Sequence, residues 1–188
     1  MTIKPICIVG EPVLHTRATE VTEFGESLRQ LVADMFETMD KAPGVGLAAP
    51  QVGVGLRVFV YDYADDDGTE RRGVVINPKL EIGPIDEGAP DWDTESEGCL
   101  SVPGERFPLK RADSAKITGV DLEQAPVSIS ATGWFARIFQ HEFDHLEGTL
   151  YVDRLVPEYQ AEVHEVIADW GWGKPGLSWL PGKDKLEG

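Results

Sequence analysis

His141, Glu142 and His145 form the pattern H-E-x-x-H, which can build a metal centre on a single helix. Residues four apart on a helix lie one turn above one another on the same face, so both imidazoles can reach one ion. Glu142 follows His141 directly, and its carboxylate can bond to a water on the ion without being a ligand, as a general base requires. The pattern predicts a hydrolytic metal site, although such a string also occurs by chance on charged helices.

A hydrolytic zinc or iron site needs a third protein ligand and one position open to water. The metzincin protease pattern is disfavoured, because Tyr151 stands where that pattern has a third histidine. Glu162 or Glu165 could serve by spacing, as the downstream glutamate does in thermolysin-like proteases. Cys99 is the competing ligand, and a buried structural thiol is the alternative interpretation of that cysteine.

The helix that carries these residues is predicted to run from Gly133 to Gly148, where glycine suits a C-terminal stop. Trp134 and Ile138 lie on the histidine side of this helix and predict an apolar wall beside the metal, suited to an apolar substrate side chain. The opposite, core-facing stripe is predicted from the spacing of Phe135, Phe139, Phe143 and Leu146.

The remaining elements follow from apolar periodicity and from β-branched runs bounded by Gly, Asp and Pro. Strands that follow one another, with helices set apart from them, indicate an α+β fold. Helices are predicted at 27–39 and 158–169, and strands at 56–62, 74–82, 115–121 and 127–131, with the acidic segment 62–72 as a hairpin-like connection.

The composition predicts one globular domain, residues 1–188, in which 157–188 form a C-terminal helix and a tail rich in Trp and Gly. No apolar run is long enough for a membrane span, and two cysteines suit a reducing compartment, so we expect a cytoplasmic protein. A net charge of −16 argues against a direct nucleic-acid site. The acidic segments 62–70 and 81–97 are predicted to be solvated loops.

Three tryptophans close to one another in the tail, Trp170, Trp172 and Trp179, predict that this segment folds back over the body of the protein. Disorder is the alternative, but so many indole rings are uncommon in a segment left in water.

Three segments together resemble the signature motifs of the peptide deformylases: GVGLAAPQ at 44–51, EGCLS at 97–101 and QHEFDHLEG at 140–148. They occur in the order and spacing of that family, and the resemblance extends over about residues 6–155. It implies an α+β domain with small antiparallel sheets packed around the H-E-x-x-H helix. It also implies that Cys99, His141 and His145 are the metal ligands.

By the same resemblance, Glu142 handles protons, while the Gln51 side-chain amide and the Leu100 backbone N–H stabilise an oxyanion. Both are neutral donors that need no protonation, which suits that role. The substrate groove is expected along Val45, Gly46 and Gly98, where an extended peptide can approach the backbone. Arg137, in the substrate-side stretch of the helix, departs from the best-known members.

The implied reaction is hydrolysis of the N-formyl group from the initiator methionine of nascent polypeptides, with release of formate. The implied cofactor is one divalent ion, expected to be Fe²⁺, although Zn²⁺, Ni²⁺ or Co²⁺ can occupy such a site. Some family members dock on ribosomes through a basic C-terminal helix. This helix is acidic, so we expect at most a transient ribosome association. An endopeptidase, and a structural zinc module that uses Cys7, are the alternatives.

Overall fold

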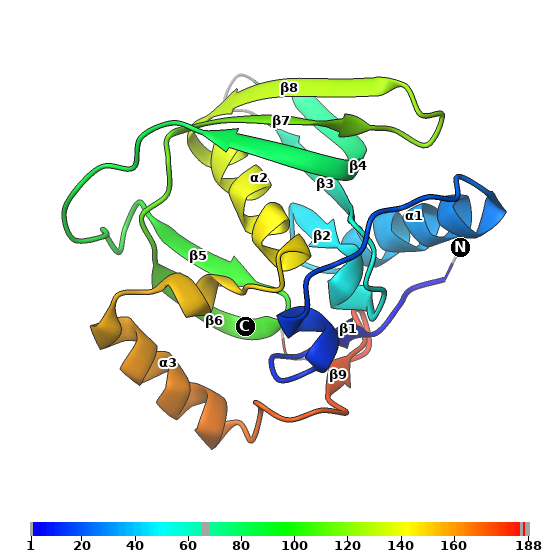
Figure 1. Ribbon diagram of the computed structural model, residues 1–188. Coiled ribbons are helices and arrows are strands. Elements are labelled where there is room, and N and C mark those ends of the chain that lie inside the picture. Colours follow the sequence, from blue (N-terminus) through cyan, green and yellow to red (C-terminus); the bar gives the residue numbers. More distant parts are fainter. Residues whose placement is uncertain (1, 65–67, 185, 187–188) are drawn as a thin grey trace.

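The computed structural model describes residues 2–64, 68–184 and 186. Its largest sheet is antiparallel, with strands in the order β2, β3, β4, β7, β8. Figure 1 shows helix α2 lying against one face of this sheet. The predicted α+β fold is confirmed. The strands are β2 (Gly46–Ala48), β3 (Val58–Ala64), β4 (Glu70–Ile82), β7 (Ser114–Val120) and β8 (Pro126–Thr132), and the helix is α2 (Gly133–Leu146).

Strand β4 begins four residues earlier than predicted, and β3 begins and ends two residues later than predicted. Together they take up most of the acidic segment 62–72. Their pairing continues through Asp62 opposite Arg72 to Ala64 opposite Glu70. Arg72 forms ion pairs with both Asp62 and Asp40, which offsets the acidic charge and lets the ladder extend. The predicted hairpin-like connection is confirmed, but residues 62–64 and 70–72 belong to the paired strands and not to a solvated loop. Asp65, Asp66 and Asp67 lie outside the described residues.

Helix α2 packs its predicted apolar stripe against the sheet. Phe139 is fully buried, and its ring lies 4.4 Å from that of Phe135 and 5.4 Å from that of Tyr61. The helix stops close to the predicted place, before Gly148, whose φ of +74° favours glycine. A Cβ at that position would also lie 2.8 Å from the backbone of Thr16. The histidine side of the helix is left to face the candidate site.

Helix α1 (Glu26–Met39) agrees with the helix predicted at 27–39. Leu28, Val32, Met35 and Met39 form one buried stripe at helical spacing. This stripe packs in a second hydrophobic cluster, which also contains Leu47 of β2. The helix thereby supports the short strand that precedes Gln51.

Two small antiparallel sheets complete the structure, as the family resemblance implies, although the residue pattern alone did not give the bounds of their strands. In one, β5 (Ser96–Cys99) pairs with β6 (Val102–Pro108); in the other, β1 (Ile6–Cys7) pairs with β9 (Ser178–Trp179). Figure 1 shows β9, near the end of the chain, lying beside β1. Short 3₁₀ helices occur at η1 (Pro12–His15), η2 (Ala49–Val52) and η3 (Tyr151–Arg154).

The acidic segment 81–97 is not a solvated loop throughout, which corrects that prediction. Its last part forms β5, and Glu97 is only 3% exposed. The buried charge is balanced by arginines from elsewhere in the chain, as described below. Earlier acidic residues of the segment, such as Asp86 and Asp91, are exposed as expected.

The C-terminal region starts with α3 (Pro157–Asp169), close to the predicted 158–169, and only Val163 of this helix is fully buried. The predicted docking of the tail is confirmed for Trp179, which is 1% exposed. Trp170 is 57% exposed and stacks on Trp172 instead. None of the helices described for this chain has the length and apolar character that a membrane span requires.

Candidate metal centre

The side chains of Cys99, His141 and His145 converge at one point. Their ligand atoms all lie within 4.8 Å of one another. Cys99 ends β5, where a register shift next to Gly98 interrupts the pairing with β6, and such irregularities re-aim side chains. Both histidines come from α2. The alternative ligands Glu162 and Glu165 are exposed on α3, so the structure favours Cys99 as the third ligand.

The chemistry of these donors fits a divalent metal ion. His141 Nδ1 lies 3.0 Å from Glu97 Oε2, which leaves Nε2 for a ligand. Burial holds the pKa of His145 well below its ordinary value, and a neutral imidazole is the form that binds metal. Burial also lowers the pKa of His141, but the Cys99 sulfur and the Glu97 carboxylate have a larger, opposite effect. The pKa of His141 is therefore raised. The same negative surroundings favour a cation.

Glu142 lies beside this group with its carboxylate buried. The residue is 3% exposed, and burial raises its pKa to about 7. Among the described residues, no hydrogen-bond partner is found for its Oε2. Gly46 packs against the carboxylate so closely that a Cβ there would collide with it. The absence of a side chain at position 46 is therefore what makes room for Glu142.

Gln51 contributes an amide group whose orientation is fixed by the fold. Its Oε1 accepts a hydrogen bond from the backbone N–H of Ala48 at 2.8 Å. Its Nε2 is consequently turned toward Cys99 Sγ, at 3.7 Å, and Ser101 Oγ, at 3.4 Å. The residue is 1% exposed, so the amide is a preoriented donor next to the candidate ligands.

A cavity of about 480 Å³ opens over this group. Cys99, His141, Glu142 and Gln51 line it, whereas His145 is not among the lining residues and is 1% exposed. The structure thus brings all the predicted site residues together. Leu100, the predicted oxyanion donor, also lines the cavity. So do all the predicted substrate-binding residues, which are Val45, Gly46, Gly98, Trp134 and Ile138.

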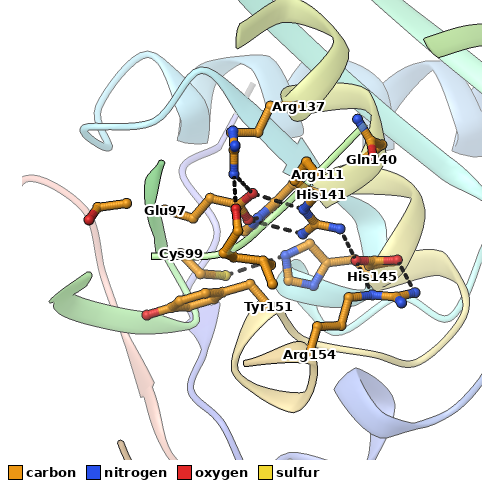
Figure 2. A network of polar contacts seen from close by, with 12 residues as sticks. Glu97, Cys99, Arg111, Arg137, Gln140, His141, His145, Tyr151 and Arg154 are labelled. Atoms are coloured by element: carbon orange, nitrogen blue, oxygen red, sulfur yellow. Dashed lines mark hydrogen bonds and ion pairs between the residues drawn. The ribbon is translucent and has the colours of Figure 1, made fainter. Parts of the chain in front are cut away.

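The prediction from sequence missed Glu97, which organises the charged network behind the ligands. Figure 2 shows this side chain between Arg111, Arg137 and His141. Arg111 donates to both oxygens of Glu97, at 2.8 and 3.0 Å, and Arg137 donates to Oε1 at 2.8 Å. Although burial opposes it, the hydrogen bonds with His141 and Arg111 hold the pKa of Glu97 well below its ordinary range. The carboxylate is therefore ionised and fixes the His141 ring.

Arg111 is in turn held by Asp144, three residues after His141 on the same helix. The distance from Arg111 Nη1 to Asp144 Oδ2 is 2.6 Å, and Arg154 contacts both oxygens of the same carboxylate. Two of these residues carried a local signal: Glu97 stands two residues before Cys99 on a strand, and Asp144 one turn from His141 on a helix. Arg111 carried none.

Residues 3–161 match the family model of the polypeptide deformylases. The chain belongs to this family. A peptide deformylase of Mycolicibacterium paratuberculosis is 56% identical over 97% of this chain and 96% of that protein. The crystal structure of a peptide deformylase from Legionella pneumophila superimposes with a TM-score of 0.77 at 36% identity, covering 90% of this chain and 95% of that one.

A peptide deformylase from Acinetobacter baumannii, crystallised with Met-Ala-Ser bound, superimposes with a TM-score of 0.71 at 34% identity, covering 81% of this chain and 98% of that one. Members of the family remove the N-formyl group from nascent peptides, and the family is metal-dependent. This chain is accordingly a hydrolase that acts on the N-formylmethionine of nascent polypeptides.

Proposed function

We propose that Cys99, His141 and His145 hold one catalytic divalent ion and that Glu142 moves the protons of the reaction. The observation that carries this proposal is the buried Glu142 carboxylate beside the three converging ligand atoms, with Oε2 lacking a partner among the described residues. When bound, the ion lowers the pKa of water and polarises the formyl carbonyl. Glu142 accepts the proton of the attacking water and returns it to the leaving nitrogen.

Gln51 and Leu100 are proposed to stabilise the negative charge that develops on the formyl oxygen. The Gln51 amide is preoriented by its bond to Ala48, and Leu100 follows Cys99 directly in the turn after β5. Preorganised neutral donors of this kind lower the barrier without reorganisation during the reaction. The small space beside Cys99 and Gln51 admits hydrogen on the carbonyl carbon but not a longer chain.

The peptide part of the substrate is proposed to lie extended along Val45, Gly46 and Gly98. The A. baumannii relative with bound Met-Ala-Ser supports a groove for the first residues of a peptide. Trp134 and Ile138 form the apolar side of the cavity, which suits a methionine side chain. Arg137 lines the cavity too, but its Nη1 donates to Glu97 and to the carbonyl of Leu109, so its guanidinium is already held by the protein.

We propose Fe²⁺ as the natural ion. A thiolate beside an open coordination position exposes an iron site to oxygen, which can also attack Cys99. Protein purified without oxygen should therefore contain iron and lose activity in air, whereas nickel or cobalt should restore it stably and zinc should give a slow enzyme. Equal rates with zinc and iron, both insensitive to air, would refute iron. Cys99→Ala should lose the metal, because two imidazoles alone hold a divalent ion weakly.

The setting of the reaction follows from its substrate. Formylated nascent chains emerge from ribosomes in the cytoplasm, so we propose that the enzyme works there as one catalytic domain that spans residues 1–188. Helix α3 exposes Glu158, Glu162 and Glu165, and this charge supports no more than transient contact with the ribosome. A direct nucleic-acid site is not proposed.

The decisive experiment compares three peptides: formyl-Met-Ala-Ser, acetyl-Met-Ala-Ser and unblocked Met-Ala-Ser. We expect formate from the first, no cleavage of the second and no fragments from the third. Cleavage at internal peptide bonds would instead identify an endopeptidase. Retention of metal and activity by Cys7→Ala would exclude a four-ligand structural zinc site, and Cys7 indeed lies outside the ligand group.

A further inference from the structure

Trp179 is a cavity-lining residue that lies outside the part of the chain that the family model covers. The match covers residues 3–161, whereas Trp179 lies in the tail. Its backbone pairs with Ile6 through β9 and β1, and its side chain is 1% exposed. The indole nevertheless lines the same cavity as Cys99 and Leu100. The docked tail thus reaches the candidate site itself.

The indole N–H of Trp179 donates to the Leu100 carbonyl at 2.8 Å. That carbonyl belongs to the peptide group between Leu100 and Ser101, whose N–H donates to Cys99 Sγ at 3.4 Å. Because a peptide group is planar, fixing its carbonyl also fixes its N–H. One rigid plane therefore links the tail indole to the sulfur of the candidate ligand.

The turn after Cys99 is tied down a second time from the other end of the chain. The backbone N–H of Val9, which follows β1, donates to the Ser101 carbonyl at 2.8 Å. Two successive carbonyls, those of Leu100 and Ser101, are thus held by segments that pair with each other through β1 and β9. Neither contact involves the metal ligands directly, so both act on the position of the turn.

We propose that Trp179 is a positioning residue that orients the Leu100–Ser101 peptide group for the reaction. Its hydrogen bond keeps the Ser101 N–H on the Cys99 sulfur. Because it holds the Leu100 carbonyl, it also restrains Leu100 itself, whose N–H belongs to the preceding peptide group and is proposed to bind the formyl oxygen. The second of these effects rests on the proposed oxyanion role of Leu100. The first concerns the ligand sulfur alone and is independent of that role.

The test uses two variants that lack the indole N–H: one keeps a bicyclic ring, and the other also loses part of the ring. Trp179 is replaced by benzothienylalanine, which is nearly isosteric but has no N–H, and separately by Phe. The matched control is Trp170→Phe, which removes the indole N–H of another tryptophan in the tail. Trp170 is exposed, and its N–H donates to the Glu105 carboxylate at 3.2 Å. Each protein is loaded with Co²⁺, and the thiolate-to-cobalt absorption band, kcat and KM for formyl-Met-Ala-Ser are measured.

Both Trp179 variants should show a shifted thiolate band and a fall in kcat of about fivefold to tenfold, the equivalent of one hydrogen bond, with KM changed by no more than about twofold. The control should match the parent in band, kcat and KM. An unshifted band and an unchanged kcat in the folded benzothienylalanine variant would overturn the proposal. If the Gln51→Ala variant keeps the kcat of the parent, the proposed oxyanion stabilisation fails. The thiolate-to-cobalt band of the Trp179 variants still decides whether Trp179 positions the turn after Cys99.

Discussion

Replacing Glu97 with glutamine should both weaken metal binding and destabilise the fold. The same carboxylate orients the His141 ring and pairs with two buried arginines. Its Oε2 lies 3.0 Å from His141 Nδ1, while Arg111 and Arg137 each contact Oε1 at 2.8 Å. The side chain is 3% exposed, so water cannot replace a lost partner. An amide has one acceptor oxygen and turns N–H donors toward neighbours that are themselves donors. At least one of the three contacts must therefore be lost.

The size of both effects follows from this geometry. Removing one partner from a buried ion pair costs about 3–5 kcal/mol, which is a large share of the roughly 5–15 kcal/mol that keeps a domain folded. Loss of a carboxylate that orients a ligating histidine weakens metal affinity by about 10–100-fold. We therefore expect Glu97→Gln to remain folded near room temperature but with a lower free energy of unfolding and a weaker hold on its ion.

Glu95→Gln is the matched control, with the same chemical change two residues earlier. Glu95 pairs with Lys110 at 2.9 Å, and the two side chains are 17% and 27% exposed. Such a pair is worth no more than about 1 kcal/mol. Denaturant unfolding gives the free energies, and competition with a chelator gives the metal affinities. If Glu97→Gln held its ion as tightly as Glu95→Gln, the role of Glu97 in fixing His141 would be refuted.

Three further predictions test the site and the fold. Glu142→Ala should keep its metal content but lose about 10²–10⁴-fold in kcat, and metal analysis showing loss of the ion would contradict its role as a proton carrier. For Gln51→Ala, formate release should reveal a kcat penalty of about 2.7–4 kcal/mol, and an unchanged rate would reduce Gln51 to a packing residue. Burial raises the pKa of Asp34, but hydrogen bonds from Gln30 and Lys4 outweigh burial and hold this pKa below its ordinary value of 3.8. The ionised carboxylate therefore stabilises the folded protein above pH 3.8, and this contribution is lost as the pH falls further. Asp34→Asn should accordingly lower the free energy of unfolding by about 0.5–1 kcal/mol near pH 7, and the difference should shrink below pH 3.8 in thermal melts.

The elements that sequence periodicity predicted are those whose apolar pattern is local. Helices α1 and α2 each bury one stripe at helical spacing, and the run of β-branched and aromatic residues at 58–61 is buried throughout in β3. Two of the proposed metal ligands could be predicted for the same reason, because His141 and His145 share one helix face whatever surrounds them. Local geometry alone fixes their relation to each other.

Glu97 was misjudged because its environment is not local. An acidic stretch without a basic residue is solvated unless charges from elsewhere reach it. Here Arg111 comes from 14 residues away and Arg137 from 40 residues away along the chain. No pattern within the segment 81–97 carries that information, and the cost of burying the carboxylate is offset only in the folded protein.

Contacts between distant parts of the chain also decide the choice of the third proposed ligand and the docking of the tail, and sequence patterns do not reveal such contacts. Cys99 and His145 are 46 residues apart along the chain, so spacing could not rank Cys99 above Glu162, and the family resemblance had to supply that choice. Trp170 and Trp179 are both tryptophans of the Gly-rich tail, and the local sequence does not distinguish them. Only Trp179 is buried, because its backbone pairs with Ile6 near the opposite end of the chain. A two-residue strand has no period to detect, and its partner is 173 positions away. The residues that bond to the turn after Cys99 are Val9 and Trp179, which lie 170 positions apart along the chain. No local sequence pattern predicts these contacts, because only the fold brings the two segments together.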